Sequence, residues 1–195
     1  MNSKDGAMSM IIETNRLILR HWEEWDAESL YEYAKNPIVG EMTGWAVHTS
    51  VEYSLHIIRE FLSKDETYAV TLKGENEAIG SIGLMKNTES NLSIGEDEAE
   101  IGYWIGEPYW GRGLIPEAVS AIMRYAFEEL GISKIWCGYF DGNEKSKRVG
   151  EKCGFRFQRT EYEKEYPQIN ATKTLHITSI SRQEWHGYLK QKSTF

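Results

Sequence analysis

The stretch that decides the fold is residues 107–116, Glu-Pro-Tyr-Trp-Gly-Arg-Gly-Leu-Ile-Pro, which lies between a predicted strand and a predicted helix. Gly111 and Gly113 permit positive φ and carry no side-chain bulk, so several backbone N–H groups can point into one cavity. The partial positive charge at the start of the helix adds to this attraction for an anion. Arg112 can contribute a charge-assisted contact. We therefore predict that this stretch holds a phosphate or pyrophosphate group.

The elements on either side of this loop form the most regular unit of the chain. Residues 98–106 alternate as a strand does, residues 116–130 form a predicted helix that ends before Gly131, and residues 134–140 form a second strand. A proline near the helix start and a glycine just past its end fit the usual asymmetry. A β–loop–α–β unit of this kind is right-handed and makes its two strands parallel.

The rest of the chain supplies further strands and helices. A turn at residues 74–77 joins two strands in a hairpin. The additional predicted strands are 15–21, 68–73, 78–86, 155–161 and 174–181, and the additional helices are 26–35, 51–62, 144–152 and 182–191. This order of elements predicts an α/β fold in which a mixed sheet carries helices on both faces.

The loop alone leaves the identity of the phosphate ligand open. Its glycines nearly match the dinucleotide pattern G-x-G-x-x-G, with Pro116 at the third glycine position. Asp141, at the end of a predicted strand, is a candidate for the ribose-binding acid of a nicotinamide-binding fold. The nucleoside-triphosphate signature G-x-x-x-x-G-K-[ST] is absent from the sequence.

The composition limits the size and the partners of the protein. With 195 residues and 41% hydrophobic residues, we expect a single domain over residues 11–195 after a disordered tail of residues 1–10. The formal net charge is −8 and no long basic run is present, which argues against nucleic acid as a partner. An acidic surface attracts amines instead. Every apolar stretch is far shorter than a membrane span, so no membrane partner is expected.

Cysteine and histidine usage indicates the compartment and argues against a metal. Cys137 and Cys153 form no C-x-x-C pair and no disulfide framework. A reducing, cytoplasmic setting is therefore expected. The five histidines are scattered and no H-E-x-x-H motif occurs, so no metal site is predicted.

Three segments, taken in order, resemble a known family. They are residues 100–105 (Glu-Ile-Gly-Tyr-Trp-Ile), residues 110–118 (Trp-Gly-Arg-Gly-Leu-Ile-Pro-Glu-Ala) and residues 143–155, which run from Asn143 to Phe155. They resemble the GNAT superfamily of N-acetyltransferases, in particular the branch of ribosomal-protein N-terminal (alanine/serine) acetyltransferases. Residues 13–20 are similar to the first strand of that branch.

The resemblance implies a fold and a donor. The sheet is expected to be mixed, mostly antiparallel, and splayed open between its fourth and fifth strands, here residues 98–106 and 134–140. Acetyl-CoA would enter the gap without any metal, with its pyrophosphate on the backbone of residues 110–115 and its pantetheine along the fourth strand. The residues implied to bind it are Tyr103, Trp104, Trp110, Gly111, Arg112, Gly113, Leu114, Ile115, Asn143 and Ser146. Aromatic residues of the early helices, Trp22, Trp25, Trp45 and Tyr53, would rim the acceptor site.

Two positions depart from the family pattern. Ile115 stands where the pattern has a small residue, and it crowds the pyrophosphate unless its side chain points into the core. Gly150 stands where many members carry the tyrosine that protonates the leaving thiolate.

Amide formation from a thioester needs a neutral amine and a protonated leaving group. An α-amine titrates near pH ~8, so a carboxylate must take its proton. Glu100, on the strand that faces the gap, matches the family's glutamate and is the candidate general base. Glu98 shares its strand face and is the second candidate. In the absence of a tyrosine at position 150, the resemblance points to Ser146 as the acid for the thiolate.

The predicted function is acetyl transfer from acetyl-CoA to a primary amine, either a protein N-terminus or a small molecule. One alternative is a catalytically silent acyl-CoA-binding sensor, which Gly150 favours. Another is a nicotinamide-dependent oxidoreductase, against which the motif in residues 143–155 weighs. Residues 174–181 can form the edge of a homodimer.

Overall fold

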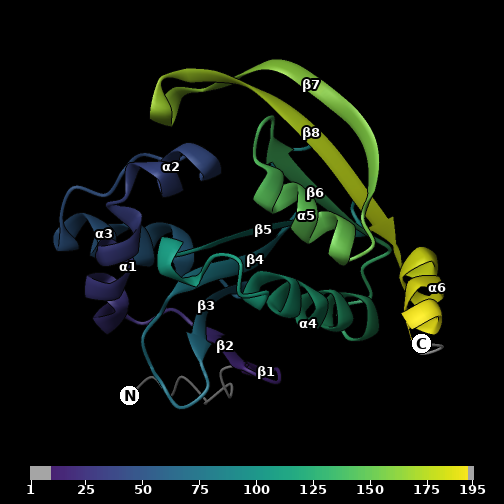
Figure 1. Cartoon of the computed structure of the whole chain (residues 1–195), viewed down its shortest axis with the longest axis horizontal. Coiled ribbons are helices and arrows are strands. Elements are labelled where there is room, and N and C mark those ends of the chain that lie inside the picture. The colour runs from purple at the N-terminus through teal and green to yellow at the C-terminus, as the bar shows by residue number, and fades with distance from the viewer. Residues whose placement is uncertain (1–9, 193–195) are drawn as a thin grey trace, which may run out of the picture.

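The computed structural model describes residues 10–192, which build one eight-stranded mixed sheet (Figure 1). The strand order is β1-β2-β3-β4-β5-β6-β8-β7, and every neighbouring pair is antiparallel except β5 with β6. The predicted α/β class and mostly antiparallel sheet are confirmed. The predicted tail lies outside the described residues apart from Met10. The strands are β1 (Ile12–Glu13), β2 (Leu17–His21), β3 (Thr67–Leu72), β4 (Gly80–Lys86), β5 (Glu98–Ile105), β6 (Lys134–Phe140), β7 (Arg156–Tyr166) and β8 (Ala171–Ser181).

Helices cover both faces of the sheet. Val70 packs in the cluster that contains the buried side of α4, whereas its neighbour Ala69 packs with α1, and adjacent strand residues point to opposite faces. None of the helices in the described residues is long and apolar enough to cross a membrane. The helices are α1 (Ala27–Ala34), α2 (Pro37–Thr43), α3 (Val51–Ile57), α4 (Leu114–Glu128), α5 (Glu144–Lys152) and α6 (Arg182–Lys192).

Several elements differ from the sequence-based prediction. Helix α2 was not predicted, although the Asn36 side chain caps its N-terminus and Gly44 ends it at φ 79°. The single helix predicted over 51–62 is α3 followed by a π-helical turn, η2 (Ile58–Leu62). The hairpin β7–β8 is longer than expected, because pairing continues through irregularities to Tyr166 and Ala171.

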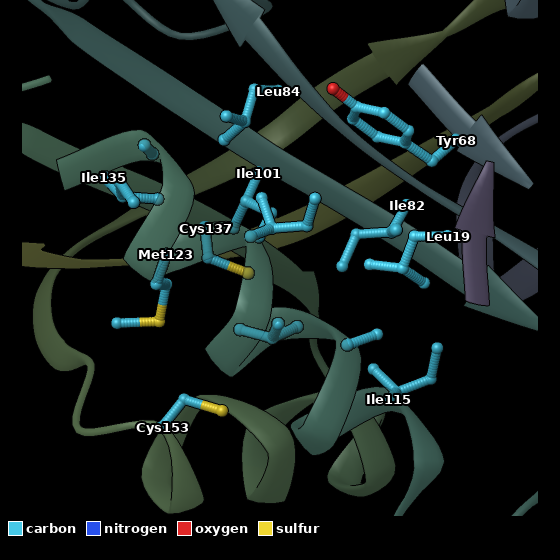
Figure 2. Packing of buried hydrophobic residues seen from close by; sticks show 14 of the residues in the cluster. Leu19, Tyr68, Ile82, Leu84, Ile101, Ile115, Met123, Ile135, Cys137 and Cys153 are labelled. Atoms are coloured by element: carbon cyan, nitrogen blue, oxygen red, sulfur yellow. The ribbon is translucent and has the colours of Figure 1, made fainter. Parts of the chain in front are cut away.

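The main core lies between the sheet and α4. Figure 2 shows Leu19, Ile82 and Ile101 from the strands facing Ile115 and Met123 from the helix, and all of these side chains are buried. Helix α4 carries apolar residues along one face. Burial of that face stabilises the fold by roughly 1.5–3 kcal/mol per large side chain. This packing fixes the start of α4, and with it the loop that precedes the helix, against the sheet.

The sheet opens between β5 and β6. The two strands are paired only at Glu98–Lys134, Ala99–Ile135 and Glu100–Trp136. Beyond Glu100 they separate, while β5 stays paired with β4 and β6 stays paired with β8. These two strands are the ones predicted to splay. They are the fifth and sixth in chain order because the two-residue strand β1 precedes the strand expected to be first.

A buried ion pair anchors α1 to the sheet. The Arg20 guanidinium on β2 binds both Asp26 carboxylate oxygens at 2.7 Å, and the Asp26 side chain is only 2% exposed. One of those oxygens also accepts the Glu23 N–H at 2.9 Å. Removal of one partner leaves the other charge buried without compensation.

We therefore predict that Asp26→Ala lowers the free energy of unfolding by about 3 kcal/mol, measured by urea denaturation. The matched control is Glu24→Ala. Glu24 also makes a two-pronged pair with an arginine, Arg59, but both side chains are exposed. The control should lose much less stability, because exposed pairs are screened by water. Equal losses in the two variants would contradict the assignment of Asp26 as an anchor.

Candidate active site

The loop that joins β5 to α4 has the backbone geometry of an anion site. Gly111 and Gly113 have φ of 74° and 72°, in the left-handed region that favours glycine. Gly113 is the N-cap of α4, so the N–H groups of Leu114 and Ile115 have no partner inside the helix. Ile115 is 6% exposed and packs in the core. Its side chain therefore does not crowd the loop, and the helix begins two residues earlier than predicted.

Arg16, which precedes β2, braces this loop from outside. Its guanidinium donates to the carbonyl oxygens of Arg112 and Gly113 at 2.9 and 3.1 Å, and to a Glu117 carboxylate oxygen at 2.7 Å. In a planar trans peptide the following N–H points away from the carbonyl oxygen. Holding these two carbonyls on Arg16 therefore turns the N–H groups of Gly113 and Leu114 to the opposite side.

Aromatic and basic side chains connect the loop to α5 across the gap. The Trp110 indole N–H donates to the Ile105 carbonyl at 2.8 Å. The Lys145 ammonium of α5 lies 3.9 Å from the centre of the Trp110 ring. Arg112 lies over the ring of Tyr109 at 5.4 Å, so its charge stays beside the loop.

The start of α5 brings three predicted residues together. The Asn143 side-chain oxygen caps the helix by accepting the Ser146 N–H at 3.1 Å. The Ser146 hydroxyl lies 3.0 Å from the Tyr103 hydroxyl of β5. Burial raises the pKa of the Tyr103 phenol well above its usual value, so the phenol stays protonated. Gly150, on the next turn of α5, is buried and contributes no acid.

The two candidate bases have different surroundings. Burial works to raise the Glu98 pKa, but hydrogen bonds from the Gly95 N–H (2.9 Å) and the Trp136 indole (2.7 Å) outweigh it and lower that pKa. Glu98 also pairs with Lys134 at 3.4 Å. Glu98 is thus stabilised as a carboxylate, with both hydrogen bonds on Oε2 and the Lys134 ammonium beside Oε1.

Glu100 is the stronger base of the two. It is half-buried at the last paired position of β5, and burial raises its pKa above 4.5 despite hydrogen bonds from Ser90 (2.7 Å) and the Asn91 N–H (3.1 Å). Both of those bonds go to one oxygen, Oε2, so the other oxygen has no hydrogen bond among the described residues. Sequence reasoning missed Ser90 and Asn91, which lie in a polar loop with no recognisable motif.

An aromatic wall covers the opening on the Glu100 face of β5. Trp104 shares that face by strand alternation, and its ring lies 5.2 Å from the ring of Trp45. A methyl group on Gly44 would meet Phe140 at 2.9 Å and Tyr166 at 3.0 Å. The segment 44–45 therefore reaches from β5 to the ends of β6 and β7, over the place where the strands diverge.

Trp45 has an unusual indole. Its Nε1 is buried and has no hydrogen-bond partner among the described residues. The other aromatics implied for the acceptor rim lie elsewhere: Trp22 is in the core and donates to Ser81, Trp25 is 66% exposed, and Tyr53 contacts His48. Trp45, through its ring contact with Trp104, lies against a strand that borders the gap.

Comparisons with known proteins agree with this geometry. Residues 16–156 match the family model of the acetyltransferase (GNAT) domain. The chain is 31% identical to the uncharacterized N-acetyltransferase YoaA of Bacillus subtilis, over 76% of this chain and 84% of YoaA. It is 36% identical to YdaF of the same organism, provisionally named a ribosomal N-acetyltransferase, over 50% of this chain and 52% of YdaF. A crystal structure of a GNAT-family acetyltransferase from Bacillus anthracis superposes with a TM-score of 0.77 at 28% identity, covering 89% of this chain and 99% of that one.

The fold and the site define an acyl-CoA-dependent acetyltransferase. The family model covers more than half of the sequence, so the chain belongs to the GNAT acetyltransferase family. Ribosomal N-acetyltransferase-like proteins are among its relatives, as the sequence predicted. The antiparallel strand order does not match the parallel sheet of the nicotinamide-binding alternative.

Substitution of Arg16 tests whether its contacts with the loop help the loop to bind acetyl-CoA. We predict that Arg16→Ala raises KM for acetyl-CoA about 10-fold with little change in kcat, because the loop must then be ordered during binding. Steady-state kinetics with varied acetyl-CoA measures this. Arg59→Ala removes another exposed arginine–glutamate pair remote from the loop and should leave KM unchanged. An unchanged KM in Arg16→Ala would refute the bracing role.

Proposed function

We propose that this protein transfers the acetyl group of acetyl-CoA directly to a primary amine, with Glu100 as general base and Ser146 as the acid for the thiolate. The observation that carries the proposal is the placement of these two groups. Glu100 lies where β5 leaves β6, and Ser146 lies on the helix that borders the same gap from the other face. An amine entering from the Glu100 face would meet a thioester whose sulfur lies toward Ser146.

The donor would bind along features that are present without it. Residues 101–105 of β5 pair with β4 on one side and with no strand on the other, within the described residues. An extended amide chain such as pantetheine can add to such an edge as a strand does. The pyrophosphate would then reach the N–H groups of the loop at Gly113, Leu114 and Ile115. Asn143 and Trp110 would flank the arm.

The base step follows from the surroundings of Glu100. A carboxylate with a raised pKa is a stronger base, and it can take a proton from the incoming ammonium directly or through water. The free amine then attacks the thioester carbonyl, and the tetrahedral intermediate collapses with loss of the thiolate. No covalent acyl-enzyme is needed, since Cys137 is a buried thiol with a pKa raised to about 12.

The acceptor is a small-molecule amine or a protein N-terminus. Trp45 and Trp104 would form its wall, and the unpartnered Trp45 indole N–H offers one hydrogen bond to it. We place the reaction in the reducing cytoplasm, in keeping with two cysteines that form no disulfide. One observation, Gly150 in place of the family tyrosine, favours the second candidate, a catalytically silent acyl-CoA sensor.

The decisive experiment is calorimetric titration with acetyl-CoA followed by detection of free thiol with a panel of amines and N-terminal peptides. Thiol release that requires an added amine supports the transferase. Tight binding without release on any acceptor supports the sensor.

The base assignment predicts different outcomes for two neighbouring glutamates. Glu100→Gln should lower kcat/KM about 100-fold. In the unaltered protein, activity falls as the pH drops through the Glu100 pKa, which lies above 4.5 because burial disfavours the charged form. Glu100→Gln should lose this acidic limb and keep only the limb set by the amine. Glu98→Gln should retain both limbs. Loss of the acidic limb in Glu98→Gln instead would reassign the base.

From the position of Trp45 we predict that its substitution changes KM for the acceptor alone. Trp45→Phe keeps an aromatic ring but removes the unpartnered N–H, so KM for the best acceptor should rise about 5-fold, as expected for one hydrogen bond of about 1 kcal/mol. KM for acetyl-CoA should stay the same. Trp25→Phe, at an exposed position, is the control. A change in KM for acetyl-CoA rather than for the amine would place Trp45 on the donor side.

A further inference from the structure

The side chain of Tyr103 occupies the base of the gap between β5 and β6. It lies three residues past the last β5–β6 pair and on the face of β5 opposite to Glu100. Its hydroxyl is 3.0 Å from the Ser146 hydroxyl and 3.4 Å from the Ser146 carbonyl oxygen. It also lies 3.8 Å from the Cys137 sulfur of β6. One phenol therefore touches both strands of the opening and the helix beside it.

The groups around the Tyr103 hydroxyl restrict which atom donates to which. Burial raises the pKa of the Cys137 thiol to about 12, so the thiol keeps its proton and can donate weakly to the Tyr103 oxygen. Tyr103 is itself protonated and must direct its own proton elsewhere. Its two acceptors among the described residues are Ser146 Oγ, at 3.0 Å, and the Ser146 carbonyl oxygen, at 3.4 Å. When Tyr103 donates to the nearer of the two, Ser146 Oγ, the Ser146 proton points at a third group.

Ser146 is held by two contacts that differ in kind. Asn143 accepts its backbone N–H, which fixes the residue in the first turn of α5. Tyr103 contacts its hydroxyl, which fixes the side chain. Gly150 leaves the next turn of the helix without a side chain, and a methyl group there would touch only the Phe155 Cβ, at 3.8 Å. The phenol nearest to the acid thus comes from β5 and not from α5.

We propose that Tyr103 is a positioning residue for thiolate protonation: its hydroxyl donates to Ser146 Oγ and turns the serine proton toward the sulfur of CoA. This inference rests on the proposed role of Ser146. Tyr103 stands in for the tyrosine that position 150 lacks, but it acts through the serine and does not touch the sulfur.

The carbon–sulfur bond of the tetrahedral intermediate breaks, and its electron pair stays on sulfur. Sulfur takes the Ser146 hydroxyl proton, and the hydrogen bond from Tyr103 stabilises the negative charge that develops on the serine oxygen. That oxygen regains a proton from solvent, and Glu100 releases to solvent the proton it took from the amine. Tyr103 keeps its own proton throughout.

A double-mutant cycle tests this coupling in the full-length protein. Ser146→Ala is expected to lower kcat about 100-fold. Tyr103→Phe is expected to lower kcat about 10-fold, the effect of one hydrogen bond in the transition state, with KM for acetyl-CoA unchanged. The double variant should have the same kcat as Ser146→Ala, because a phenol that acts through the serine has nothing to act on without it. Tyr125→Phe removes a phenol on α4 away from the gap and should retain full activity.

Four outcomes would overturn the inference, and they distinguish its failure from the failure of the proposed function. A further 10-fold loss in the double variant relative to Ser146→Ala would show that Tyr103 acts independently. Full activity of Tyr103→Phe, with Ser146→Ala impaired, would refute the role of Tyr103 and leave Ser146 as the proposed acid. Full activity of Ser146→Ala would refute both the role of Tyr103 and the assignment of Ser146 as the acid. Thermal unfolding of each variant checks folding, and a lowered Tm in Tyr103→Phe that accounts for the lost activity would assign Tyr103 to packing alone.

Discussion

The whole active site depends on the loss of pairing between two parallel strands. Strand β5 and β6 share three residue pairs and then part after Glu100 and Trp136. Each strand remains paired with its outer neighbour, so each half of the sheet continues past the opening. Residues 101–105 of β5 thereby keep one edge without a strand partner among the described residues. On a protein surface an unpaired strand edge can pair with another chain and cause aggregation. In a cleft it can bind an extended ligand.

The opening also sorts the chemistry by face. Because neighbouring residues of a strand point to opposite sides, Glu100 and Trp104 share one face of β5, where Trp104 packs with the early helices, while Tyr103 points to the face that carries α4 and α5. In the proposed mechanism, proton removal from the acceptor and proton delivery to the leaving group take place on opposite sides of one strand. The thioester between them would need no large movement of the protein to reach both.

Much of this architecture could be predicted from local patterns in the sequence. The glycines at 111 and 113, the helix that follows and the pair of flanking strands could be predicted because each depends on short-range backbone rules. The brace from Arg16 and the hydrogen bonds to Glu100 from Ser90 and Asn91 could not, since they join segments whose approach is set by the folded sheet. Helix α2 was missed for a related reason. Its seven residues are too short to show a period, and it is defined by its caps.

The contact between Arg16 and the loop has a consequence for how the enzyme is made. Arg16 lies 101 residues before Glu117, so this part of the candidate binding site closes only after α4 has been synthesised. Arg16, in the turn between β1 and β2, cannot make these bonds before α4 is present. Contacts of such long range slow folding. A nascent chain that stops short of α4 can build neither the brace nor the loop. Competence to bind the donor is therefore acquired late, and together with the main core.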